Sequence, residues 1–166
     1  EGTAATFLKK MLTPRDPNFV DIRSPVGSGT GQIGYSYDGT IYPSDEGRMV
    51  AAMGDDIFAI GHVESSSYED IVRHPTVRAI AVASLLDSLP SCSTCFNAPY
   101  CGVRPLHNYM NGGDLFGQRP NTPKCAEYMH MTKQLFSRLI EDDDGEVETI
   151  FRRWVIERPR MDDTSQ

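Results

Sequence analysis

The stretch Cys92–Pro105, CSTCFNAPYCGVRP, contains three of the four cysteines in this chain. The fourth cysteine, Cys125, follows after 23 intervening residues in the segment TPKCAEYM. The surrounding segment 90–121 is rich in proline, glycine and asparagine, and a loop of this length without secondary structure of its own is typically functional or disordered. We therefore expect a metal or disulfides to supply the order that a hydrophobic core cannot supply here.

Four uses of the cysteines compete. Unrelated buried thiols are a poor explanation, because three of them fall within ten residues. Disulfides need an oxidising compartment, and the sequence begins without a recognisable export signal. A structural zinc site typically has two Cys-x-x-Cys knuckles, or one plus a histidine pair. The chain has one such knuckle, and His107 and His130 do not form a pair. A four-thiolate iron–sulfur cluster also suits the spacing, so spacing alone leaves zinc and iron–sulfur open.

The strongest predicted helix follows the loop, with Thr122 as N-cap and Pro123 at the first helical position. Apolar residues then recur at helical spacing, and Cys125 lies on the same stripe in the first turn. Backbone amides at this helix start would favour the negative charge of a cluster. The stripe consists of Cys125, Tyr128, Met129, Thr132, Leu135, Phe136 and Leu139.

The rest of the chain predicts short strands and helices, so the fold class is α+β with a β-hairpin, helices and a cysteine-rich loop. Asp38-Gly39 is a two-residue turn signal between alternating strands. Ser67 with Asp70 is a helix-capping pair. Further helices are expected at 4–11, at 75–86 and after Gly145, and a further strand at 57–63. The last helix would bury Val147, Ile150, Phe151 and Trp154, with Trp154 in the core.

The composition excludes two classes of partner. The net charge is −7, from 16 basic and 23 acidic residues, which argues against non-specific nucleic-acid binding. No apolar run is long enough to span a membrane, and without an export signal we expect a cytoplasmic protein. Because the first residue is Glu rather than Met, we expect a fragment of a longer protein.

The motif CSTCFNAPYCG with a later helix-borne cysteine resembles the SPASM domain. This is the C-terminal auxiliary-cluster domain of many radical S-adenosylmethionine enzymes that modify ribosomally made peptides and proteins. Full-length family members bind two [4Fe–4S] clusters there. The resemblance implies that Cys92, Cys95, Cys101 and Cys125 hold the cluster farther from the radical centre.

The ligands of the other auxiliary cluster are replaced at three separate positions. Val26 in RSPVGSGTGQIGY stands where the family has cysteine in SPCGAGxGQIAY. Ser44 in DGTIYPSDEGR stands at the cysteine of Gly-x4-Cys, and Arg104 in CGVRPLHNY at the second cysteine of CGxCPxHNY. The resemblance therefore implies a single auxiliary cluster, with zinc as a conceivable substitute.

The segments YDGTIYPSDEGRM and HNYMNGGDLFGQRP are most similar to the His-Xaa-Ser system radical maturases, and the resemblance covers roughly residues 20–140. It implies three parts: residues 1–20 as the end of a preceding domain or linker helix, 21–141 as the SPASM-like domain, and 142–166 as an acidic linker and C-terminal helix. S-adenosylmethionine and the radical-generating cluster would belong to an upstream domain, because no Cys-x3-Cys-x2-Cys occurs in the chain. We expect the 166 residues alone to be inactive.

The implied partners are a substrate peptide or protein and a partner maturase. The cluster would support structure, substrate placement and electron relay. Asp45 follows Ser44 where related sulfatase-modifying enzymes carry a proton-accepting Asp, so it is a candidate catalytic base; a helix-cap carboxylate is the alternative. The competing function is a stand-alone zinc or iron–sulfur module that recruits a peptide or maturation partner without catalysis.

Overall fold

The structure is a computed structural model, and it describes residues 2–156, with side chains described through residue 155. The chain divides into two compact units, Val20–Thr122 and the pair of segments Glu1–Phe19 and Pro123–Gln166. Helices and one small antiparallel sheet make up an α+β fold, as the sequence predicts. Within residues 2–156, no helix combines the length and apolar character that crossing a membrane requires.

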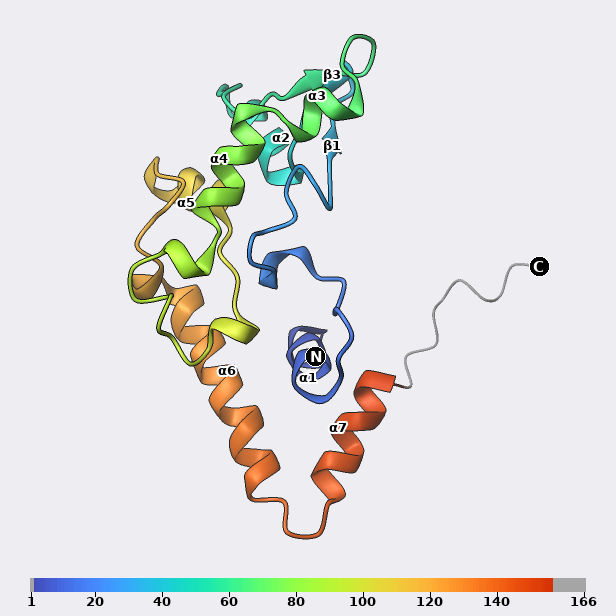
Figure 1. The fold of residues 1–166 in the computed structure, drawn as a ribbon, viewed down its shortest axis with the longest axis vertical. Helices are drawn as coiled ribbons and strands as arrows, with labels where there is room; N and C mark the ends of the chain where they lie inside the picture. Colours follow the sequence, from blue (N-terminus) through green and yellow to red (C-terminus); the bar gives the residue numbers. More distant parts are fainter. Residues whose placement is uncertain (1, 157–166) are drawn as a thin grey trace, which may run out of the picture. The chain divides into compact units, whose positions relative to one another are not determined.

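The terminal segments build a unit of three helices: α1 (Gly2–Leu12), α6 (Pro123–Ile140) and α7 (Glu146–Ile156). Figure 1 shows α1 end-on between the other two, and α1 packs against both. Phe7 and Leu8 on α1 are fully buried. The Phe7 ring meets Tyr128 of α6 edge-on, with 5.2 Å between ring centroids. This aromatic contact joins the first and last parts of the chain.

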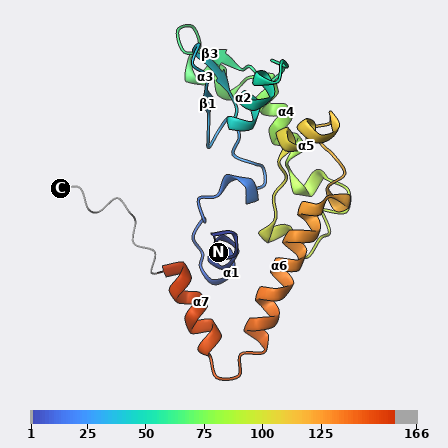
Figure 2. The ribbon, with the colours of Figure 1, turned by 180° about the vertical axis from the view of Figure 1, so that it is seen from behind.

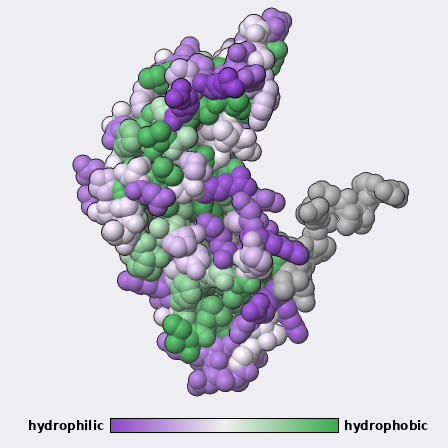
Figure 3. Space-filling view, viewed as in Figure 1, coloured by the Kyte–Doolittle hydropathy of each residue, from purple (hydrophilic) through white to green (hydrophobic). Residues whose placement is uncertain are grey.

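The predicted stripe on α6 is confirmed, since Tyr128, Thr132 and Leu135 are buried and Cys125 is half-buried. The prediction for α7 is wrong at two positions, because Ile150 is 40% and Trp154 is 48% exposed. Val147 and Phe151, on the same predicted stripe, are half-buried. Figure 3 shows hydrophobic residues at the surface over the lower part of α6 as well.

The other unit contains the sheet, in the order β1 (Gly34–Tyr35), β2 (Thr40–Tyr42) and β3 (Gly61–His62). The predicted hairpin is confirmed, with Tyr35 opposite Ile41. Its turn is one residue longer than predicted, because Ser36 N–H donates to Thr40 O (2.9 Å) and Gly39 N–H to Ser36 O (3.1 Å). Gly39 has φ +90°, the conformation of the bulge that closes a three-residue hairpin loop.

Two apolar clusters hold this unit together around α2 (Asp45–Ala52), α3 (Tyr68–Val72) and α4 (Pro75–Ala83). The predicted cap of α3 is confirmed, since Ser67 and Asp70 form a reciprocal capping box. One cluster contains Val26, Tyr42, Val50, Phe58, Ile80 and Leu106, and the other Ile41, Ile60, Ile71 and Val77.

Helix α4 ends at Ala83, earlier than the predicted Leu86. A longer helix would use the Leu86 amide for its own ladder, but that amide donates to Ser24 Oγ (2.9 Å). Ser84 Oγ likewise donates to Ile80 O (2.9 Å) and accepts from Val26 N (3.0 Å). These side-chain bonds compete with the helix and fasten the segment around Val26 to the end of α4. The short 3-10 helices η1 (Val20–Ile22) and η2 (Leu86–Ser88) lie beside this junction in sequence.

The segment 90–121 is more ordered than predicted, because it contains α5 (Pro105–Gly112) and two 3-10 helices, η3 (Ala98–Tyr100) and η4 (Arg119–Asn121). Proline opens α5 at its first turn, and Gly113 at φ +69° ends it. In Figures 1 and 2 the sheet lies at one end of the unit 20–122, and the cysteine-bearing loop lies at its other end.

Candidate metal centre

The cysteine loop is a chain of consecutive turns. Cys92 N–H donates to Leu89 O, Cys95 N–H to Cys92 O, Ala98 N–H to Cys95 O and Cys101 N–H to Ala98 O, at 3.1–3.2 Å. Each turn begins at the residue where the previous one ends. The three cysteines are three and six residues apart, and the hydrogen bonds of the loop join residues three apart, so the two periods match.

Two of the three cysteine sulfurs accept N–H hydrogen bonds. The backbone amide of Asn97 lies 3.4 Å from Cys95 Sγ. The guanidinium Nη2 of Arg119 lies 3.5 Å from Cys101 Sγ. Cys92 and Cys101 are buried and Cys95 is half-buried. Hydrogen bonds to sulfur are among the features by which proteins set the properties of thiolate-bound metal centres.

Arg119 is the unexpected member of this site. It belongs to η4 and is only 6% exposed. A buried guanidinium is unfavourable unless anionic or acceptor groups surround it, and the Cys101 sulfur is one of its acceptors. The guanidinium places positive charge beside that sulfur, an arrangement that suits a thiolate ligand of a metal.

Gly102, directly after Cys101, permits a close approach of two backbone segments. A Cβ at this position would collide with the carbonyl oxygen of Asp21 and lie 2.7 Å from Ile22 Cα. The motif YCG thus requires glycine at this position, because the cysteine loop passes directly against the backbone of η1.

The four cysteines lie in different units. Cys92, Cys95 and Cys101 belong to Val20–Thr122, whereas Cys125 lies in the first turn of α6. All four are described, and none forms a disulfide. Within the described part of the chain, no three Cys, His, Asp or Glu side chains come close enough together to hold a metal ion.

Two of the three cysteine-replacement positions, far apart in sequence, line one small cavity. Val26 and Arg104 both line it, together with Asp21 and Glu46. The third position, Ser44, donates from Oγ to Glu46 Oε2 at 2.7 Å. The cavity has a volume of about 10 Å³, roughly the room that one water needs. The surrounding side chains leave space for little more than one water.

The three positions Val26, Ser44 and Arg104 carry an apolar, a polar and a charged side chain. Val26 is 3% exposed and belongs to the larger apolar cluster, and Ser44 is 1% exposed at the start of α2. Arg104 Nη1 lies 3.3 Å from Asp21 Oδ2, with both side chains mostly buried. A valine, a serine bonded to Glu46 and an arginine paired with Asp21 thus occupy the three positions.

The candidate base Asp45 is an exposed carboxylate at the start of a helix. Its side chain is 69% exposed in the first turn of α2 and accepts two hydrogen bonds from Arg48, at 2.7 and 2.9 Å. A carboxylate there interacts favourably with the helix start, so the structure favours the helix-terminus interpretation. His107 is exposed and lines the small cavity.

Compared with protein-family models, with curated proteins and with solved structures, the chain has no match.

Sequence reasoning missed Arg119 and Asn97 as neighbours of the sulfurs. Asn97 is 2% exposed, between Cys95 and Cys101, and a buried asparagine inside a Cys-x5-Cys loop is a usable signal. Arg119 lies 18 residues beyond Cys101 in a proline-rich stretch, and no local pattern marks it.

Proposed function

We propose that this chain is the C-terminal auxiliary-cluster domain of a radical S-adenosylmethionine enzyme that modifies a ribosomally made peptide or protein. In this proposal, Cys92, Cys95, Cys101 and Cys125 hold one [4Fe–4S] cluster. The observation that carries it is the small cavity that Val26 and Arg104 line with Glu46, the partner of Ser44. These three positions, which the resemblance identifies as lost cluster ligands, are spread over 79 residues of sequence. A lost inner cluster beside a retained outer one accounts for that arrangement.

The donor chemistry fits a thiolate-bound cluster. All four cysteines are outside disulfides, and N–H groups donate to two of their sulfurs. The guanidinium of Arg119 adds positive charge beside Cys101, which offsets the negative charge of thiolate ligands. Asn97 restrains Cys95 through its backbone amide. These contacts orient the ligands and set the electrostatics around them.

When bound, such a cluster supplies a one-electron redox centre and a four-way cross-link. Because four thiolates leave no open iron position for substrate, the cluster would stabilise the fold and relay electrons. The small cavity and the ion pair of Arg104 with Asp21 support one cluster rather than two in this proposal. We therefore infer that support of the fold is the larger part of its role.

Metal analysis of the 166-residue chain, purified without oxygen, tests the proposal. We expect about four iron and about four sulfide per chain, with broad visible absorption. Cys92→Ser, Cys95→Ser, Cys101→Ser and Cys125→Ser should each lower the iron content strongly. The control is Thr94→Ala, an exposed position in the same loop that should retain full iron.

Three outcomes would contradict the proposal. One zinc per chain without visible absorption would identify the stand-alone zinc module instead. About eight iron per chain would contradict a single cluster, because it requires ligands beyond these four cysteines. Retention of full iron in Cys125→Ser would remove the helix-borne cysteine from the ligand set.

A further inference from the structure

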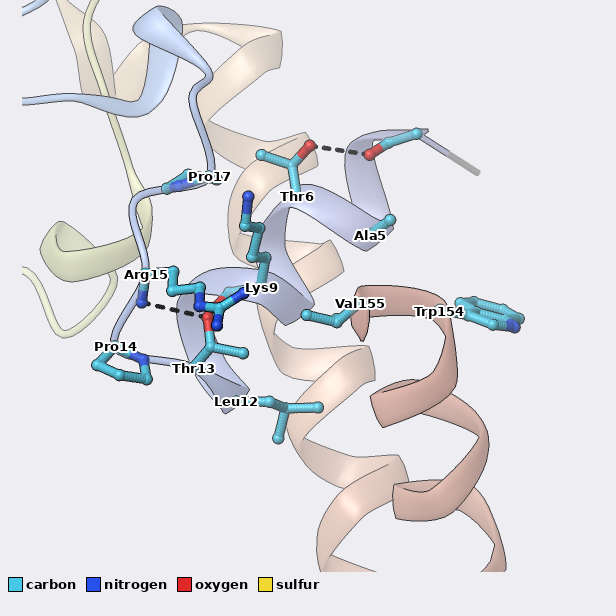
Figure 4. A pocket seen from close by; sticks show the side chains of 11 residues that line it. Ala5, Thr6, Lys9, Leu12, Thr13, Pro14, Arg15, Pro17, Trp154 and Val155 are labelled. Carbon is cyan, nitrogen blue, oxygen red and sulfur yellow. Dashed lines mark hydrogen bonds between the residues drawn. The ribbon is translucent and has the colours of Figure 1, made fainter. Parts of the chain in front are cut away.

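A pocket of about 640 Å³ lies in the unit formed by the terminal segments (Figure 4). This volume is within the range of ligand-binding sites. One face of α1, the turn after it and the end of α7 form its walls. The lining residues are Gly2, Ala5, Thr6, Lys9, Leu12, Thr13, Pro14, Arg15, Pro17, Trp154 and Val155.

The pocket is cationic. Lys9 and Arg15 line it, and none of its described lining residues is acidic. Thr13 joins the two cationic segments, because its Oγ1 donates to Lys9 O (2.7 Å) and accepts from Arg15 N (3.3 Å). Figure 4 shows the side chains of Lys9, Thr13 and Arg15 together on one side of the pocket. The turn thus places two cationic residues on the same side of the pocket, in a chain of net charge −7.

The opposite side is apolar. Trp154 and Val155 of α7 lie there with Ala5 of α1. Trp154 is 48% exposed, which leaves a large indole surface available. Exposed aromatic rings are typical anchors of binding sites.

The pocket is long in one direction. Its lining follows α1 from Gly2 to Leu12, and 1.5 Å of rise per residue gives about 15 Å. An extended peptide covers about 3.3 Å per residue, so about five residues span the pocket. A small anion would occupy the cationic side alone and leave the indole uncovered.

We propose that this pocket binds a short extended peptide segment that carries a carboxylate beside an apolar side chain. The carboxylate pairs with Lys9 and Arg15, and the apolar side chain covers Trp154. This inference goes beyond the cluster and does not depend on it, because none of the cysteines lines the pocket.

The fluorescence of Trp154 provides a direct test, since it is the single tryptophan of the chain. The probe is a capped five-residue peptide of alternating glutamate and leucine, added to the full chain. We expect a saturable change in emission that weakens as salt rises, because salt screens the ion pairs. The same peptide with glutamine in place of glutamate should bind at least about fivefold more weakly.

Matched variants locate the binding. Lys9→Gln with Arg15→Gln should weaken binding by about fivefold or more. Lys133→Gln with Arg138→Gln removes the same charge from exposed positions on α6 outside the pocket and should leave binding unchanged. Circular dichroism of both variants confirms that the helices remain.

Three results would overturn the proposal. The first is no saturable emission change with the acidic peptide while the chain is folded. The second is equal binding of the glutamate and glutamine peptides. The third is binding only after removal of residues 157–166, which include Asp162 and Asp163; the occupant would then be the chain's own end rather than a separate peptide.

Discussion

Arg119 places its guanidinium Nη2 3.5 Å from the sulfur of Cys101, and the two residues are 6% and 9% exposed. A 3-10 helix supplies the arginine and a turn of the cysteine loop supplies the sulfur. Charge-assisted hydrogen bonds in such a buried place are stronger than neutral ones. The pair therefore gives the proposed cluster site an electrostatic feature that can be measured.

Arg119→Gln should lower the reduction potential of the loaded site. A nearby cation stabilises the more negative reduced form, so its removal makes reduction harder. A charge-assisted bond of about 1.5–3 kcal/mol sets an upper limit of about 65–130 mV on the shift for one electron. A redox titration followed by visible absorption measures the shift. Arg138→Gln, exposed on α6, is the control. An unchanged potential at full iron content would show that the pair does not tune the site.

Gly102→Ala should destabilise the unit 20–122 severely. The new Cβ would collide with Asp21 O and lie 2.7 Å from Ile22 Cα, and backbone cannot move aside as a side chain can. We expect a loss of about 2–4 kcal/mol in the free energy of unfolding, measured by chemical denaturation. Gly112→Ala is the matched control, because its Cβ would meet open space at the end of α5. Equal stability of the two variants would contradict the close approach.

The ion pair of Arg104 with Asp21 should contribute more to stability than the exposed pair of Arg48 with Asp45. The former side chains are 27% and 19% exposed, the latter 46% and 69%. We expect Arg104→Ala to cost about 1–2 kcal/mol, less than for a fully buried pair because water still reaches it. Double-mutant cycles should give a larger coupling for the first pair. A coupling below that of the exposed pair would contradict this account of the filled cavity.

Asp142 should make the stability of α7 depend on pH. Its carboxylate accepts from Glu148 N (2.8 Å) and Val147 N (3.0 Å). The Glu148 amide is the main cause that lowers the pKa of Asp142 below its ordinary 3.8. Because the folded pKa is depressed, the stabilisation is fully present above the ordinary value and is lost as pH falls through the folded pKa.

Thermal unfolding followed by circular dichroism from neutral to acidic pH checks this prediction. Asp142→Asn should lower the midpoint temperature by a few degrees near neutral pH and approach the parent chain in acid. Asp143→Asn, at an exposed neighbouring position, should follow the parent at every pH. A difference for Asp142→Asn that persists unchanged into acid would exclude the ionised carboxylate as its cause.

Local chemistry made much of the fold predictable. The capping box at Ser67, the helix start at Pro123 and the hairpin around Gly39 depend on neighbours in sequence, and all are observed. The predictions failed where distant groups compete. Ser24 accepts the Leu86 amide and α4 ends early, and Ile150 and Trp154 of α7 lie at the surface. Helix α5 was missed although Pro105 and Gly113 mark its ends.

The candidate site also has a part that the sequence predicts and a part that depends on folding. The cysteine motif and its resemblance to a family are properties of the sequence, and the single-cluster interpretation remains a prediction. Only folding brings Val26, Arg104 and Glu46 to one cavity.

Local sequence specifies the elements and the donors: the α+β class, the turn-forming cysteine spacing and the helix that carries Cys125. Which distant groups meet depends on how the chain folds. Arg119 reaches Cys101 across 18 residues, and Lys9 shares a pocket with Trp154. The physical reason is that capping, turns and periodicity act between near neighbours. Burial and charge pairing act between surfaces that meet only after the chain has folded.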